Sequence, residues 1–148
     1  MRIAITMTNG GVAVMTIIGR PDATEVERNI ILWSAANPDL YASHRPLGDD
    51  EELPASRAFR DAWTDRGGVV VDMPKARELH RSRMRAARGP KLAELDTQYL
   101  RADERGDAET KQTTAAQKQA LRDVTADPAI EAAQTPEELD AVMPDILK

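Results

Sequence analysis

Two histidines, His44 and His80, are the first residues to consider for catalysis or metal binding. They lie in different expected elements, and neither belongs to a histidine spacing typical of metal sites. The chain has no cysteine, which excludes disulfides, thiolate metal sites and thiol nucleophiles. No serine lies in a Gly-x-Ser-x-Gly motif, and neither Gly-Gly pair opens a phosphate-binding loop. We therefore expect no catalytic residue, no metal and no cofactor, and we interpret the chain as not an enzyme.

The acidic run Asp49–Glu52 is the other cluster that could do chemistry, because carboxylates bind hard cations. Calcium loops, however, place their ligands at alternate positions around a glycine turn, and this run has neither feature. We interpret it as part of a solvated loop over residues 37–54, which contains three prolines and could present itself to a partner.

A basic segment stands out in a chain whose net charge is −5. Residues 75–91 contain seven Lys or Arg and one Glu, and Arg77, Arg81, Arg85 and Arg88 share one face of a predicted helix. Such an edge could bind the phosphates of a nucleic acid, which would make the chain a nucleic-acid-binding or regulatory module. Ion pairs with the acidic second arm of the chain, or with a neighbouring subunit, are the interpretation we favour. We therefore expect the arginines to bind protein carboxylates and not DNA.

The elements that position these residues begin with a predicted β-hairpin. Two β-branched runs, residues 2–8 and 12–18, flank Asn9-Gly10-Gly11, and Asn-Gly favours a type I′ turn. A helix should follow, with Asp22 as its N-cap and Pro38 at its end. It turns a face made of Val26, Ile30 and Trp33 towards the hairpin.

Two aromatic residues follow the 37–54 loop. Phe59 and Trp63 are four residues apart, so one helical turn would place them side by side. They would then form either a core contact or an anchor for a partner protein, since tryptophan is enriched at interface centres. Residues 69–71 should form a short strand that joins the hairpin.

Helices are predicted for the rest of the chain. Asp72 caps a helix that runs to about Arg105, with a break or kink at Gly89-Pro90. A second helix covers about residues 108–125, and a short last helix follows Thr135. The expected class is α+β, with a small head over residues 1–72 and a helical hairpin or coiled-coil stalk over residues 73–148. The apolar residues of this hairpin are Leu92, Leu95, Tyr99 and Ala102 on the first helix, and Ala116, Ala120, Leu121 and Val124 on the second.

The stripe on the first of these helices is too narrow for a large core and too apolar for water. We therefore expect residues 92–124 to mediate self-association or docking, and we expect a homo-oligomer. No apolar run reaches the roughly 18 residues of a membrane helix, and no signal peptide is expected at the start.

Residues 53–144 resemble small tail-region proteins of tailed bacteriophages and prophages. The resemblance rests on LPASRAFRDAW, VDMPKARELHRSRMRAARGPKLAELDTQYLRA and KQALRDVTADPAI. Tail-fibre assembly chaperones often end in an arginine-rich helix, a leucine-rich stretch with Thr-Asp, and a helix with Gln-Ala-Leu-Arg-Asp. Here residues 77–88, 92–96 and 119–123 take those places.

The resemblance implies a partner-binding protein of the virion, or of the host cytoplasm during assembly, with other tail or fibre proteins as partners. Phe59, Trp63, Arg77, Arg81, Arg85, Leu92, Leu95 and Tyr99 are the expected partner-binding residues. The tryptophan after Thr-Asp and the Trp-Pro ending of the chaperones are absent, so a chaperone and a related minor virion component both stay open.

Overall fold

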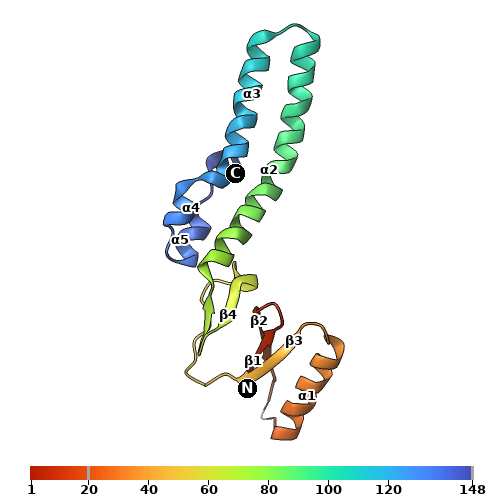
Figure 1. Cartoon of the computed structure of the whole chain (residues 1–148), viewed down its shortest axis with the longest axis vertical. Helices are drawn as coiled ribbons and strands as arrows, with labels where there is room; N and C mark the ends of the chain where they lie inside the picture. The colour runs from red at the N-terminus through yellow and green to blue at the C-terminus, as the bar shows by residue number, and fades with distance from the viewer. Residues whose placement is uncertain (20, 148) are drawn as a thin grey trace. The chain divides into compact units, whose positions relative to one another are not determined.

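The computed structural model describes residues 1–19 and 21–147 and consists of two compact units, residues 1–76 and 77–148 (Figure 1). The first unit is an antiparallel β region with one helix, and the second is helical, which confirms the α+β class. The boundary falls just inside the long helix α2 (Met73–Glu104), beyond the predicted boundary at residue 72.

A three-stranded antiparallel sheet forms the centre of the first unit. Its strands are β1 (Arg2–Met7), β2 (Val12–Thr16) and β3 (Tyr41–Pro46), in the spatial order β2-β1-β3. The predicted hairpin is confirmed as β1 and β2, with Ile3 opposite Met15 and Ile5 opposite Ala13. Because successive side chains alternate between faces, Ile3 and Ile5 lie on one face and Ala4 on the other.

The hairpin turn differs from the predicted type I′ turn. Gly10 has a φ of +76°, but no described residue other than glycine has a positive φ, so Asn9 does not adopt the required conformation. Gly10 N donates to Met7 O over 2.9 Å, and Met7 N donates to Gly11 O over 2.8 Å. This pattern is typical of a three-residue loop with a left-handed glycine at its third position. The loop is thus Thr8-Asn9-Gly10, one residue longer than the predicted turn, and Gly11 N donates to the Asn9 side chain over 2.9 Å.

Helix α1 (Ala23–Ala36) covers the face of the sheet that carries Ile3 and Ile5. The Asp22 side chain accepts a hydrogen bond from Glu25 N over 2.8 Å, which confirms the predicted N-cap. Ile30 is buried, and Val26 and Trp33 pack against the same cluster, so the predicted face is confirmed.

The opposite face of the sheet packs against a second, two-stranded sheet, β4 (Trp63–Asp65) and β5 (Val69–Val71). Two predictions are wrong here. Residues 37–54 are not wholly irregular, because they contain β3. Residues 69–71 do not join the first hairpin, because β5 pairs with β4 through the turn at Gly67.

An ion-pair network ties β3 to β4 and to the loop after β3. Arg45 contacts both oxygens of Glu51 at 2.7 Å, and its Nε lies 2.5 Å from Asp65 Oδ2. The hydrogen bonds that Arg45 donates lower the pKa of Glu51 from 4.5 to about 2. The bonds to Glu51 and Asp65 also raise the pKa of Arg45 itself. Part of the acidic run therefore has a structural role.

This network predicts acid sensitivity of the first unit. A carboxyl with a lowered pKa in the folded state stabilises the fold fully above its unfolded pKa, and the gain disappears as pH falls towards the folded pKa. Stability should therefore decrease between pH 4.5 and about 2. In the Glu51→Gln variant, the free energy of unfolding should depend less on pH in this range. Glu52 is an exposed neighbour, so the Glu52→Gln variant should keep the pH dependence of the wild type. Urea unfolding followed by tryptophan fluorescence tests this, since both tryptophans lie in the first unit. If the free energy of unfolding of Glu51→Gln changed with pH as steeply as that of the wild type, the network would not be the cause of the acid sensitivity.

The second unit is an antiparallel pair of helices, α2 and α3 (Ala108–Asp123), followed by short elements (Figure 1). These are η2 (Val124–Ala126), α4 (Pro128–Ala132), α5 (Pro136–Ala141) and η3 (Asp145–Leu147). Thr135 and Glu138 form a capping box at the start of α5, as expected of the last helix. Ile130 and Leu139 have no exposed surface, and Met84 of α2 is equally buried.

Helix α2 continues through Gly89-Pro90, so of the predicted break or kink the break is wrong. Proline removes one backbone hydrogen bond and usually disturbs a helix. Here contacts on both sides of Pro90 support the helix: Arg88 donates to Arg122 O over 2.9 Å and Lys91 to Ile146 O over 2.8 Å. Tertiary contacts therefore outweigh the local cost of proline.

Candidate protein-binding surfaces

The two histidines lie in different units of the structure and bind different partners. His44 is exposed on β3, with its Nδ1 2.7 Å from the Tyr41 hydroxyl. His80 is buried in the second unit, with its Nε2 2.8 Å from Val142 O. Among residues 1–19 and 21–147, no group of three or more His, Asp or Glu side chains is placed to hold a metal ion.

The arginine row on α2 binds mainly main-chain carbonyls of the second unit. Arg77 donates to Ile130 O over 3.1 Å and to Ala133 O over 2.7 Å. Arg81 donates to Thr125 O and to the Glu131 carboxylate, and Arg88 donates to Leu121 O and Arg122 O. Arg85 instead pairs with Glu78 of its own helix at 2.8 Å.

These bonds satisfy carbonyls at the C-terminal ends of α3, η2 and α4, where carbonyls lack partners within the helix. Carboxylates are also present, as the prediction stated: the hydrogen bond from Arg81 lowers the pKa of Glu131, and that from Arg85 lowers the pKa of Glu78. Sequence reasoning missed the carbonyls, because every residue carries one and no residue type marks them.

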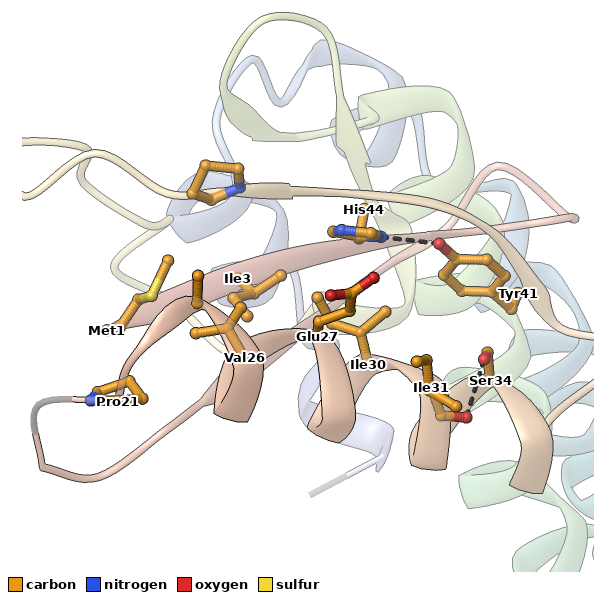
Figure 2. Close-up of a pocket in the computed structure, with 12 residues that line it drawn as sticks. Met1, Ile3, Pro21, Val26, Glu27, Ile30, Ile31, Ser34, Tyr41 and His44 are labelled. Atoms are coloured by element: carbon orange, nitrogen blue, oxygen red, sulfur yellow. Dashed lines mark hydrogen bonds between the residues drawn. The ribbon is translucent and has the colours of Figure 1, made fainter.

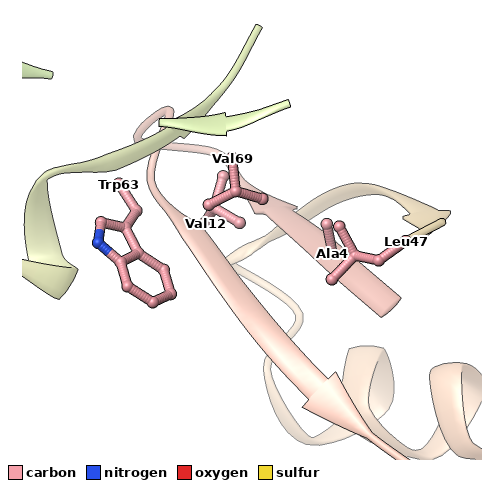
Figure 3. Packing of buried hydrophobic residues seen from close by; sticks show 5 residues of the cluster. All are labelled: Ala4, Val12, Leu47, Trp63 and Val69. Carbon is pink, nitrogen blue, oxygen red and sulfur yellow. The ribbon is translucent and has the colours of Figure 1, made fainter. Parts of the chain in front are cut away.

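Phe59 and Trp63 belong to the interior of the first unit. Phe59 is fully buried, and Trp63 packs with Ala4, Val12, Leu47 and Val69 (Figure 3). They do not share a helical turn, because residues 60–62 form a single 3-10 turn (η1, Arg60–Ala62) and β4 starts at Trp63. The indole N–H of Trp63 is buried and has no acceptor within the described chain.

The apolar stripe of α2 lies along its contact with α3. Ala102 is buried, and Leu92, Leu95 and Tyr99 are only half-buried. On α3 the buried residues are Thr114 and Leu121, with Val124 just beyond, whereas the predicted Ala116 and Ala120 are exposed. The seam is therefore narrower than the sequence indicated.

The two flanks of this seam differ in chemistry. On one flank, Lys111 and Lys118 lie over the Tyr99 ring at 5.3 and 5.0 Å, and Lys118 pairs with Asp96 at 2.6 Å. On the other flank is a shallow groove of about 400 Å³, which we call the seam groove. Its lining includes Leu95, Leu121 and Ile146, with Gln98 and Gln117 beside them.

A larger groove of about 670 Å³ lies between α1 and β3 in the first unit (Figure 2). Its walls are mostly apolar, and Glu27 and His44 face it from opposite sides (Figure 2). The sequence offered one signal for this groove, Ile31, a large apolar residue outside the predicted face of α1. Ile31 lines the groove and is 58% exposed.

Comparison with known proteins adds no relative: no protein-family model, no curated protein and no solved structure matches this chain. Within the described part of the chain, no helix combines the length and apolar character that a membrane span requires.

Proposed function

We propose that this chain is a non-enzymatic tailed-phage protein that acts by binding other virion proteins. It would serve as a minor tail or fibre-associated component, or as a tail-fibre assembly chaperone, in the virion or in the host cytoplasm during assembly. The resemblance of residues 53–144 suggests this class. The observation that supports it best is the incompletely buried seam between α2 and α3.

The seam leaves apolar surface that a further helix could cover. Leu95 is half-buried and lines the seam groove together with Ile146, which is 37% exposed. Full burial of a large apolar side chain is worth about 1.5–3 kcal/mol. The buried side chains of the seam are Ala102, Thr114, Leu121 and Val124. The burial of so few side chains barely offsets the conformational entropy that is lost when the two helices are ordered. Helices of a second copy, or of another tail protein, would supply the missing contacts.

Nucleic-acid binding through the arginine row is the alternative, and the contacts of that row argue against it. Arg77, with its side chain 15% exposed, and Arg88 already donate to carbonyls of the second unit. A phosphate backbone would have to replace these bonds, which the fold of α4 and η2 needs.

Self-association provides the test of the seam. We expect the wild-type chain to form oligomers in analytical ultracentrifugation, and the double variant Leu95→Ala/Tyr99→Ala to sediment as a monomer. Leu100→Ala is the matched control: Leu100 lies on the same helix but is 61% exposed. It should associate like the wild type. Circular dichroism checks that the double variant keeps its helices.

A wild-type chain that stays monomeric at high concentration, with its α2–α3 amides protected from hydrogen exchange, would contradict self-association. Mass spectrometry of purified particles then separates the two proposed roles. A structural component stays in the mature particle, whereas a chaperone leaves it.

A further inference from the structure

We propose that the outer edge of β2 is a docking site for an extended, acidic segment of a partner protein, which adds a strand to the sheet beside Arg57 and Arg60. This site lies in the first unit and does not depend on the seam of the second.

The hydrogen-bond pattern shows which backbone groups face outwards from β2. Met7 N donates to Gly11 O, and Ile17 N donates to Met1 O. In an antiparallel ladder the directly bonded pairs alternate. Ala13 and Met15 therefore bond to β1, while Val12, Val14 and Thr16 direct their N–H and C=O groups away from it. Val12 is buried, with 3% of its surface exposed, so the edge is open at Val14 and Thr16. No hydrogen bond within the described residues uses the outward backbone groups of Val14 and Thr16.

The two outer edges of the sheet differ in how they are protected. On β3, Pro46 lacks an N–H, and Arg45 Nη1 donates to its carbonyl over 3.3 Å. Both features hinder the addition of a further strand. β2 has the sequence Val-Ala-Val-Met-Thr, without a proline or a charge. The free edge of this sheet is therefore β2.

A groove of about 570 Å³ runs beside this edge, and we call it the edge groove. Val12, Val14 and Thr16 line it from the strand, and Leu53 and Trp63 contribute apolar surface. Figure 3 shows Trp63 beside the strand that carries Val12. An incoming strand would thus find backbone partners on β2 and apolar surface for alternate side chains, as in strand addition generally.

Charge decides which strand fits. Three arginines line the edge groove, with Asp61 as the one acidic side chain among its described lining residues. Arg2 donates to Gly48 O and Glu51 O, but Arg57 and Arg60 are exposed and have no carboxylate partner in the described chain. The groove is basic within a chain of net charge −5. An acidic side chain next to the backbone ladder would form charge-assisted bonds with Arg57 or Arg60.

The probe is a fluorescein-labelled peptide of alternating valine and glutamate, titrated with the full chain and followed by anisotropy. We expect saturable binding that weakens with salt. A peptide with lysine in place of glutamate should bind at least tenfold more weakly. A Val-Glu peptide N-methylated at alternate residues, which cannot complete the ladder, should not bind.

Two variants separate the backbone from the charge contribution. Val14→Pro removes one outward N–H without touching the bonds to β1, and should abolish binding, whereas Val14→Thr keeps the N–H and should bind like the wild type. Arg57→Glu/Arg60→Glu should weaken binding at least tenfold. Arg28→Glu reverses the charge of an exposed arginine on α1 and should have no effect.

Several results would overturn the proposal: no binding at millimolar peptide, equal binding of the N-methylated peptide, or equal binding by Val14→Pro. Binding of a single-stranded oligonucleotide that depends on Arg57 and Arg60 but tolerates Val14→Pro would show a simple charged patch instead. If Val14→Pro unfolds, the N-methylated peptide on the wild type still decides. The Leu95→Ala/Tyr99→Ala variant should bind the peptide normally, so this site can fail or succeed independently of the seam.

Discussion

Phe59→Ala should lower the free energy of unfolding of the first unit by about 3–5 kcal/mol, the usual cost of removing a fully buried phenylalanine. Phe59 has no exposed surface, so the substitution leaves a cavity that its neighbours fill only in part. Urea unfolding followed by tryptophan fluorescence measures the change, because Trp33 and Trp63 both report on this unit. Ile18→Ala is the control: Ile18 is 94% exposed, and its loss should cost less than about 0.5 kcal/mol.

This measurement also decides between the two interpretations of the aromatic pair. A core residue changes stability first, and binding only as a consequence. If the Phe59→Ala variant had the free energy of unfolding of the wild type but no longer bound a partner protein, Phe59 would be an interface anchor and not a core residue.

Arg77→Ala should destabilise the second unit by about 2–4 kcal/mol. The substitution removes two charge-assisted hydrogen bonds and leaves Ile130 O and Ala133 O without their donor. Arg85→Ala is the matched control on the same helix. Its side chain is 46% exposed and pairs only with the exposed Glu78, so the expected cost is below about 1 kcal/mol.

Helical circular dichroism during urea unfolding, with hydrogen exchange of the amides around Ile130, measures both variants. Arg77→Lys should recover little of the loss, because an ammonium group cannot reproduce the two-carbonyl geometry of the guanidinium fork. Equal, small effects of Arg77→Ala and Arg85→Ala would mean that the carbonyl contacts do not hold the C-terminal segment.

The sequence was sufficient where local chemistry decides the structure. Asn9-Gly10 between β-branched runs led to the hairpin, and Asp22 and Asp72 led to helix starts, because N-caps act within three residues. β3 was missed for the opposite reason. Its residues Tyr-Ala-Ser-His-Arg-Pro show no apolar alternation, and the strand forms by pairing with β1, far away in the sequence.

The candidate sites divide in the same way. A helical repeat was enough to place the arginines on one face and Leu95 and Tyr99 on another. The sequence did not show the main-chain carbonyls that the arginines bind, the loosely covered seam, or the different protection of the two edge strands. All three features arise only when segments distant in the sequence meet. The continuity of α2 through Pro90 likewise depends on contacts with Arg122 and Ile146.

The free edge of β2 also bears on aggregation. An uncharged strand of high β-propensity with open backbone groups is a template for pairing between identical chains. Pairing of two β2 edges would bring Arg57 and Arg60 of both copies to the same side of the joined sheet, where like charges repel. The arginines that favour an acidic strand therefore also oppose β2–β2 pairing. Replacing both with neutral residues should make the purified chain more prone to aggregate, most of all at low salt, where the lost repulsion is strongest.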